Sequence, residues 1–228
     1  MTWKQVFASS VGRKITMGLT GIFLILFLIV HVGLNACIWA MDHGAMFNRA
    51  AHFMGATVVP RILEVGLFVF LLLHIIQGLV LEASNRSKRG TAYAVNYGNR
   101  GSRWYSRSMG LLGTIILLFL CVHLVHFWIP SRFSEMQEID LGNGILVHNL
   151  YGLMQNVFTE GWVSIVYVLG CISLAYHLAH GFLSAFKTVG VHNKRYIQLI
   201  NGLGLAFSII VPLAFAMMPL SFYFHWVN

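Results

Sequence analysis

The sequence of 228 residues predicts an all-α integral membrane protein with five transmembrane helices in a single membrane domain, residues 1–228. Three observations predict this fold class. Hydrophobic residues make up 57% of the chain and charged residues only 10%, whereas a soluble domain carries about 25% charged residues. Five long runs lack charge, and the net charge of +8 lies in the segments between them. Such a composition argues against a soluble enzyme, a disordered chain and a secreted disulfide scaffold.

Each helix is expected where an apolar run can cross a bilayer, whose hydrocarbon core takes about 20 helical residues. The predicted helices cover residues 15–40, 62–83, 108–130, 161–186 and 196–218. A sixth uncharged stretch, 141–159, is rich in Gly and Asn, so we expect it at the membrane surface or outside the membrane. The first run is too long for the core of a signal peptide, so we expect it to be retained.

The charged residues give the direction of the helices. With the N-terminus in the cytoplasm, all Lys and Arg fall inside except Arg49, Arg61 and Arg132, which leaves 12 of 15 on that side. All seven acids except Glu82 fall outside or at the outer helix ends. This distribution follows the positive-inside rule with the C-terminus outside. The basic charge is therefore explained by topology, and no nucleic-acid partner is expected.

Histidine is frequent for so apolar a chain. Six of the eleven histidines lie within the predicted helices: His31, His74, His123, His126, His177 and His180. Measured from the cytoplasmic helix ends, His31 and His123 lie roughly 24 and 22 Å deep, and His74 and His177 about 14 Å deep. Four helices thus supply one histidine each, in two pairs at two depths. Ionisable residues inside a membrane are costly and usually functional, although a single histidine can also simply bond a neighbouring helix.

Two facing imidazoles at equal depth suit a six-coordinate haem iron, because ligands on separate helices leave a slot for the ring. We therefore expect His31 with His123, and His74 with His177, as the axial iron ligands of two haems. These four histidines are the predicted metal-binding residues. The chain has no C-x-x-C-H motif, so the haems are expected to be non-covalent, of b type.

The residues beside these ligands leave alternatives open. Gly78 and Gly181 each follow an inner histidine by four residues, where they would keep side chains away from a porphyrin. Small residues also serve ordinary close packing of membrane helices. His126 and His180 would worsen the depth match by roughly 4.5 Å, so we interpret them as neighbours or haem-propionate partners. Zinc is conceivable on the H-x-x-H spacing, but no carboxylate lies at these depths to complete its ligands.

Two haems at two depths would carry electrons across a bilayer. The loops contain no nucleotide motif, iron–sulfur cysteine cluster or P-loop, so a partner must produce or consume the electrons. The basic inner surface, which includes Arg86, Arg100, Arg103 and Arg107, is a candidate docking surface, although topology alone also explains these charges. A lipid-soluble quinone is the expected second redox partner.

Several segments of the chain match one family. They are HVGLN from His31, FNRAAHFM from Phe47, LEVGLFVFLLLHIIQG through the His74 motif, HLVHFW from His123, and YHLAHGF around His177 followed by FKTVGV. The chain resembles the di-haem cytochrome b anchor subunit of succinate:menaquinone oxidoreductases (succinate dehydrogenase) and fumarate reductases. The resemblance runs from about Lys14 to the last helix, and that family has five membrane helices, the first four forming the haem-binding bundle.

The resemblance implies specific roles. His74 and His177 would hold the proximal haem b, nearer the cytoplasm, and His31 and His123 the distal haem b. A flavoprotein with FAD and an iron–sulfur subunit would lie on the cytoplasmic side of a bacterial inner membrane. Succinate oxidation or fumarate reduction would occur on the flavoprotein, whereas the reaction with menaquinone would occur on this chain near the distal haem.

The quinone site is not fixed by this likeness. Asp42, His43, His52 and Glu64 are candidates by position, and His52 can instead pack the loop. Two other functions stay open: a cytochrome b anchor of another membrane dehydrogenase, of hydrogenase or formate dehydrogenase type, and a haem-free transporter or structural membrane protein.

Overall fold

The computed structural model describes residues 9–89, 104–142, 144–191 and 193–227. In chain order its elements are α2 (Ser10–Asn35), η1 (Ala36–Ala40), α3 (Ala45–Ala56), α4 (Val58–Arg89), α5 (Trp104–Arg107), α6 (Met109–His123), η2 (Leu124–Trp128), α7 (Ile129–Phe133), β1 (Glu138–Asp140), β2 (Leu146–His148), α8 (Leu150–Phe158), α9 (Gly161–Thr188) and α10 (Lys194–Tyr223). The predicted basic loop residues Arg100 and Arg103 lie outside the described residues.

Five described helical spans are long and apolar enough to cross a membrane, which confirms the predicted fold class. They cover Val11–Ala40, Val58–Ser87, Met109–Phe133, Gly161–Thr188 and Tyr196–Tyr223. The predicted ranges differ from these by up to about one turn of helix at either end. The helices continue past the uncharged runs because the backbone bonds of a helix do not stop where charged side chains reach water.

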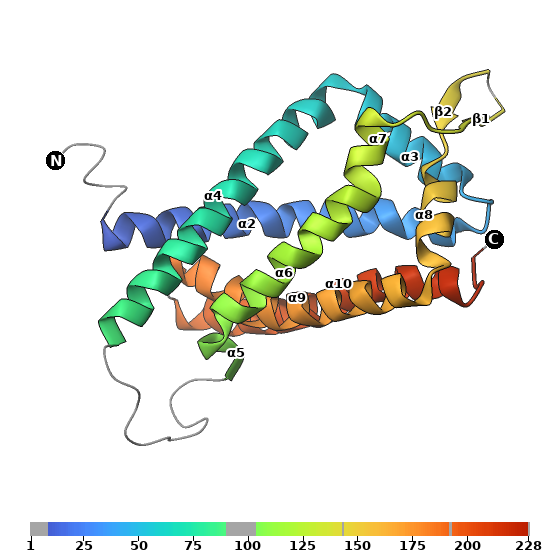
Figure 1. The fold of residues 1–228 in the computed structure, drawn as a ribbon. Helices are drawn as coiled ribbons and strands as arrows, with labels where there is room; N and C mark the ends of the chain where they lie inside the picture. Colours follow the sequence, from blue (N-terminus) through green and yellow to red (C-terminus); the bar gives the residue numbers. More distant parts are fainter. Residues whose placement is uncertain (1–8, 90–103, 143, 192, 228) are drawn as a thin grey trace.

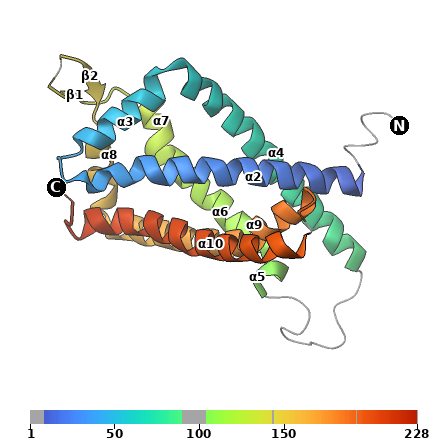
Figure 2. The same cartoon turned by 180° about the vertical axis from the view of Figure 1, so that it is seen from behind.

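The helices fall into two groups by direction. Helices α2, α9 and α10 run side by side along the molecule, whereas α4 and α6 cross them obliquely (Figures 1 and 2). Helix α9 contacts α2, α6 and α10, so it is the central helix of the bundle. Helix α4 is peripheral, since none of its most apolar stretch is buried, compared with 39% in α9 and α10. Its exposed Val, Leu and Ile side chains suit contact with lipid.

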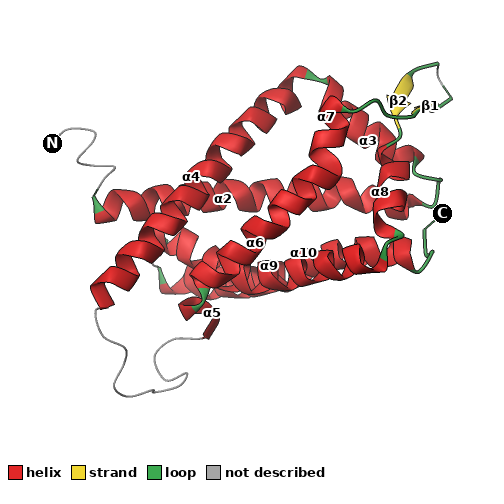
Figure 3. Cartoon of the chain, in the orientation of Figure 1, coloured by secondary structure: helices red, strands yellow, loops and turns green. Residues whose placement is uncertain are grey.

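The segment 141–159 does not form a membrane span. It includes β2, which pairs antiparallel with β1 so that Ile139 lies opposite Val147, and the nine-residue helix α8. Nine residues reach only about 14 Å, too short to cross a bilayer. The strands β1 and β2 are the only strands in the described chain. Together with α8 they lie at the end of the molecule where the described chain ends after α10 (Figure 3). The start of α2 and α5 lie at the opposite end (Figure 1).

Two packed clusters hold the bundle together. The larger lies at the C-terminal end and joins η1, α3, α8, α9 and α10 through buried side chains such as Ile38, Phe47, Phe158 and Phe222. The smaller cluster joins α2 to α9 through Ile25, Leu178 and Phe182. The six histidines predicted to lie within the membrane are all on helices of the bundle that these clusters hold together.

Candidate functional site

The structure places His31 of α2 opposite His123, the last residue of α6. Their ring centroids are 5.9 Å apart and the rings are nearly perpendicular, at 87°. Phe27 stacks on His31 at 5.0 Å, and Phe119 and Phe127 lie 5.9 and 5.5 Å from His123. This pair therefore lies among aromatic rings that exclude water.

A second pair lies nearer the end of the molecule where α2 begins. His74 of α4 and His177 of α9 have ring centroids 6.3 Å apart and an interplanar angle of 66°. Sequence depth alone grouped the four histidines in this way, and the structure brings the same partners together. We call His31 with His123 the outer pair, and His74 with His177 the inner pair.

The spacing of both pairs fits a bis-histidine haem. An imidazole nitrogen binds a metal ion at about 2.0–2.1 Å, so two rings on opposite sides of one iron have centroids roughly 6 Å apart. In the described chain no group of three or more His, Cys, Asp or Glu residues could hold a metal ion. A haem needs only two protein ligands because the porphyrin supplies four nitrogens, whereas a zinc ion needs at least a third. The donor set therefore fits haem and argues against zinc.

His74 of the inner pair has a hydrogen bond that orients its ring. Thr20, only 2% exposed, donates its hydroxyl hydrogen to the Thr16 carbonyl at 2.8 Å. Its oxygen also lies 3.2 Å from Nδ1 of His74. Because the hydroxyl has a single hydrogen, Thr20 can accept a bond from Nδ1–H of His74. That tautomer leaves the Nε2 lone pair of His74 free to bind iron.

The other three paired histidines differ in this respect. The Asn35 side chain donates to the His31 carbonyl at 2.8 Å and lies 3.4 Å from Nδ1 of His31. The Nδ1 atoms of His123 and His177 are buried and have no hydrogen-bond partner among the described residues. Buried polar atoms without partners commonly mark sites that a ligand or water completes.

The sequence predicted Gly78 and Gly181 beside the inner pair, but other glycines face its rings. A Cβ on Gly181 would meet nothing within 4 Å, whereas a Cβ on Gly78 would lie 3.4 Å from the end of Met17 in α2. Two unpredicted glycines face the inner rings. A Cβ on Gly21 would lie 3.6 Å from His74, and one on Gly113 would lie 3.9 Å from His177. They lie on α2 and α6, each ten residues before an outer histidine, His31 or His123, rather than on the helices that carry the inner histidines.

His126 lies in the one described π-helical turn, η2, directly after His123. Its Nδ1 atom is 3.1 Å from the hydroxyl of Tyr167 in α9, and the two rings stack with an angle of 8°. Single π-helical turns are frequent at functional sites. Here the turn places His126 against α9 beside the outer pair. No sequence pattern marks Tyr167, because its role depends on which face of α9 meets η2.

The four quinone candidates do not form one cluster in the described structure. Asp42 accepts a bond from the Met46 amide at 2.8 Å, and the neighbouring His43 is exposed with a left-handed φ of 56°. His52 is exposed on α3. Glu64 is engaged elsewhere, on α4 at its junction with α7.

The Glu64 carboxylate forms the clearest ion pair between helices in the described chain. It accepts two bonds from Arg132 of α7, at 3.1 and 3.0 Å, and a third from the Trp128 indole at 2.6 Å. A bidentate arginine pair of this kind fixes geometry. Glu64 therefore joins the outer ends of α4 and α7, and it has little capacity left for a ligand.

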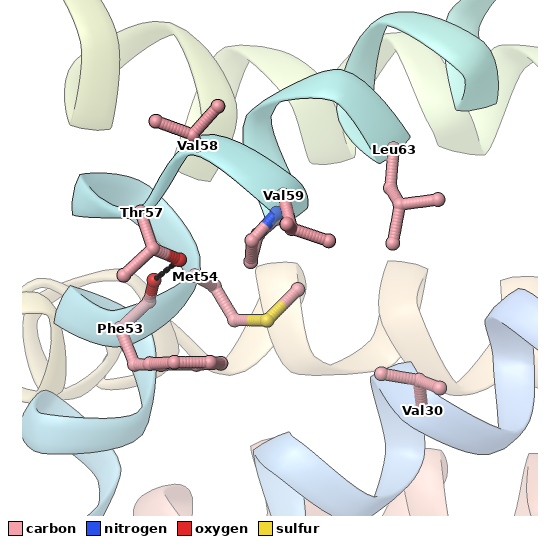
Figure 4. A pocket seen from close by; sticks show the side chains of 8 residues that line it. Val30, Phe53, Met54, Thr57, Val58, Val59 and Leu63 are labelled. Carbon is pink, nitrogen blue, oxygen red and sulfur yellow. Dashed lines mark hydrogen bonds between the residues drawn. The ribbon is translucent and has the colours of Figure 1, made fainter.

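A cavity of about 410 Å³ lies away from the histidine rings. It lies between α2, α3 and the start of α4, as Figure 4 shows. Its lining is apolar: Val30, Phe53, Met54, Thr57, Val58, Val59, Pro60 and Leu63. The hydroxyl of Thr57 is bonded to the Phe53 carbonyl at 2.7 Å, so the cavity presents no free polar group. It suits a hydrocarbon chain rather than a reacting group.

The fold and the paired histidines define a class: a multi-pass, all-helical membrane protein with imidazole pairs at two levels of its bundle. The chain is similar to the succinate dehydrogenase cytochrome b558 subunit of Bacillus subtilis (strain 168), with 24% identity over 168 residues, 73% of each chain. No family model and no solved structure matches the chain.

Proposed function

We propose that this chain is the membrane anchor and electron-transfer subunit of a succinate dehydrogenase or fumarate reductase. It passes electrons through two b haems between a cytoplasmic iron–sulfur subunit and menaquinone. The observation that carries the proposal is the pairing of four histidines from four helices at ring separations of 5.9 and 6.3 Å. The similarity to a succinate dehydrogenase cytochrome b558 subunit supports the same assignment.

The two pairs are spaced suitably for electron transfer. Thr20 marks the level of the inner pair on α2, because it contacts His74. His31 of the outer pair lies eleven residues further along the same helix, a rise of roughly 16 Å between the two levels. Haem, when bound, supplies a one-electron carrier at each level.

The residues of the chain would set the conditions for that transfer. Thr20 holds the inner ring in the tautomer that presents Nε2 to the metal. Phe27, Phe119 and Phe127 cover the outer pair and exclude water from it. A buried position away from water changes a haem potential and prevents electrons from leaving at the wrong point.

The proposed partners follow from the two ends of the bundle. The described basic residues on the side where α2 begins and α5 lies belong to helix ends: Arg13, Lys14, Arg86, Arg107 and Lys187. On that side, the cytoplasmic face of the bacterial inner membrane, the iron–sulfur subunit and the FAD flavoprotein would dock. Succinate chemistry would stay on the flavoprotein, and menaquinone would react with this chain near the outer pair.

The test is haem quantitation on the purified full-length chain or its complex. We expect a reduced-minus-oxidised spectrum of b type with about two haems per chain. A copurified flavoprotein that oxidises succinate would distinguish this anchor from one of a hydrogenase or formate dehydrogenase. Absence of haem would overturn the proposal and favour a haem-free membrane protein.

Ligand variants sharpen the test. His74→Ala or His177→Ala should each remove one haem, because a six-coordinate iron loses half of its protein ligands. His126→Ala and His180→Ala are matched controls, each three residues after a proposed ligand, and should retain both haems. Loss of a haem in His180→Ala together with its retention in His177→Ala would reassign the inner ligand.

A further inference from the structure

The cavity between α2, α3 and the start of α4 lies among side chains that face away from the bundle. Five of its lining residues are more than half exposed: Val30, Phe53, Val58, Val59 and Leu63. Val58 is also the first residue of a candidate membrane span, so in a membrane the cavity opens to lipid. Its volume of about 410 Å³ falls within the range of small-molecule sites, about 300–1,000 Å³.

A corner between two helices shapes this cavity. Helix α3 ends at Ala56 and α4 begins at Val58, so Thr57 alone separates them. Thr57 has an extended backbone, with φ −97° and ψ 149°, which turns the chain out of the helical direction. Val30 of α2 lies across from the corner (Figure 4). The cavity therefore follows from the course of the backbone, and its lining is apolar on all three helices.

A positive charge lies at the same corner. The Nε atom of Arg61 donates to the Gly55 carbonyl at 2.7 Å. Gly55 lies in the chain between the lining residues Met54 and Thr57, and Arg61 directly follows the lining residue Pro60. The guanidinium is therefore held beside the cavity, and 53% of the Arg61 side chain is exposed.

A second arginine adds to this charge. A Cβ on Gly55 would lie 3.4 Å from Nη1 of Arg132, so both arginines flank Gly55. Arg132 donates two bonds to the Glu64 carboxylate, at 3.1 and 3.0 Å, whereas Nη1 of Arg61 stays 3.9 Å from it. Two arginines thus share one carboxylate, which leaves a net positive charge at the corner. The first turn of α4 adds the partial positive charge of a helix N-terminus.

An apolar cavity beside an exposed cation matches one class of membrane molecule. An anionic phospholipid has a hydrocarbon chain that suits the lining and a phosphate that arginine N–H groups bind. We propose that the corner of α3 and α4 binds an anionic phospholipid, with an acyl chain in the cavity and the phosphate on Arg61. This site is independent of the proposed haems and of electron transfer. A quinone tail and a second copy of this chain would use only the apolar lining, so a test of the charge distinguishes them.

The test is native mass spectrometry of the purified full-length chain with two lipids that have the same acyl chains. Phosphatidylglycerol is anionic and phosphatidylcholine is zwitterionic, and we expect the chain to bind phosphatidylglycerol more tightly. Arg61→Gln should weaken phosphatidylglycerol binding about fivefold, the contribution of one basic residue to binding of anionic lipid, and should affect phosphatidylcholine less. Arg61→Lys keeps the charge and should keep the preference. Lys14→Gln, an exposed residue near the start of α2, loses the same charge and should bind both lipids like the unmodified chain.

A second variant tests the cavity itself. Leu63→Trp places a large ring in the apolar lining and should weaken the binding of both lipids. Leu79→Trp is the matched control, because Leu79 lies on the same helix with the same exposure of 55% and does not line the cavity. The two positions are separated by roughly 24 Å along α4.

Several results would overturn the proposal. One is equal affinity of the unmodified chain for the two lipids, and another is unchanged binding in both Arg61→Gln and Leu63→Trp. Displacement of the lipid by menaquinone, with no effect of Arg61→Gln, would assign the cavity to a quinone tail. A dimer that Leu63→Trp abolishes without any change in lipid binding would assign it to a second copy. The melting temperature of each variant in lipid-free detergent should match that of the unmodified chain, which shows that weaker lipid binding is not a loss of fold.

Discussion

Thr20→Val should change the properties of the inner pair without changing its packing. Valine has nearly the same shape as threonine but no hydroxyl, so His74 loses the acceptor that lies 3.2 Å from its Nδ1 atom. A neutral hydrogen bond contributes about 0.5–1.5 kcal/mol net. An imidazole whose Nδ1–H is bonded donates more electron density to iron, which favours the oxidised state.

That energy converts directly into a potential. If about 1 kcal/mol of the bond acts on the oxidised state alone, the proximal midpoint rises by roughly 40 mV in a one-electron couple. Outer-shell changes of this kind also cost about 10- to 100-fold in metal affinity. The inner haem of Thr20→Val should therefore titrate at a higher potential and dissociate more readily than in the unmodified chain.

The assay is a potentiometric titration of the haem absorbance bands of the purified chain. Thr20→Ser retains a hydroxyl and should restore the original midpoint. Thr16→Val is the matched control, because the Thr16 hydroxyl bonds the Gly12 carbonyl at 3.1 Å rather than a histidine. Equal midpoints in Thr20→Val and the unmodified chain, or an equal shift of both haems, would refute the reasoning.

Three further changes test other contacts. Gly21→Leu should reduce the haem content from about two to one per chain, since its side chain would enter the space beside the inner ring, whereas Gly21→Ala should keep both because its Cβ meets that ring at an ordinary 3.6 Å. Glu64→Gln should lower the melting temperature by a few degrees, because the partly buried ion pair with Arg132 is lost, and it should leave the haem spectra unchanged. A weakened quinone affinity at constant stability would instead make Glu64 a ligand-binding residue. Leu178→Ala should cost about 2–5 kcal/mol of unfolding free energy, because Leu178 belongs to the smaller packed cluster; thermal unfolding in detergent measures the loss. Leu169→Ala, on the exposed face of α9, should cost far less.

The membrane spans could be predicted because their signal is local. A run without charge, long enough to cross the hydrocarbon core, has few alternatives to a helix. That the stretch 141–159 forms no membrane span was predictable for the same reason, since its Gly and Asn residues interrupt the apolar run. The small hairpin and α8 within it were not predicted, because β1 and β2 are only three residues long and the capping bond from Gly152 to Asn149 is specific to the folded loop.

The residues around the histidines could not be predicted, because their roles depend on helix rotation. Thr20 and Tyr167 each contact a histidine more than forty positions away in the chain. Which of the faces of two helices meet is set by the packing of all their side chains. The rotation of each helix about its own axis cannot be read from one sequence. A π-helical turn such as η2 contains one extra residue, so it changes this rotation further.

The depth of a histidine in the bundle is not simply its distance from the end of its helix. Measured from the observed helix ends, His74 lies fifteen residues before Arg89, whereas His177 lies only eleven residues before Thr188. Their rings are nevertheless 6.3 Å apart, because α4 is oblique to α9 and a longer path along a tilted helix covers less depth (Figure 1). Hydrophobic length therefore predicts a level in the membrane better than helix length does, since charged residues extend a helix beyond the bilayer by different amounts. In this chain the uncharged runs predict equal depths for the inner histidines, although the helices that carry them end at different distances from those residues.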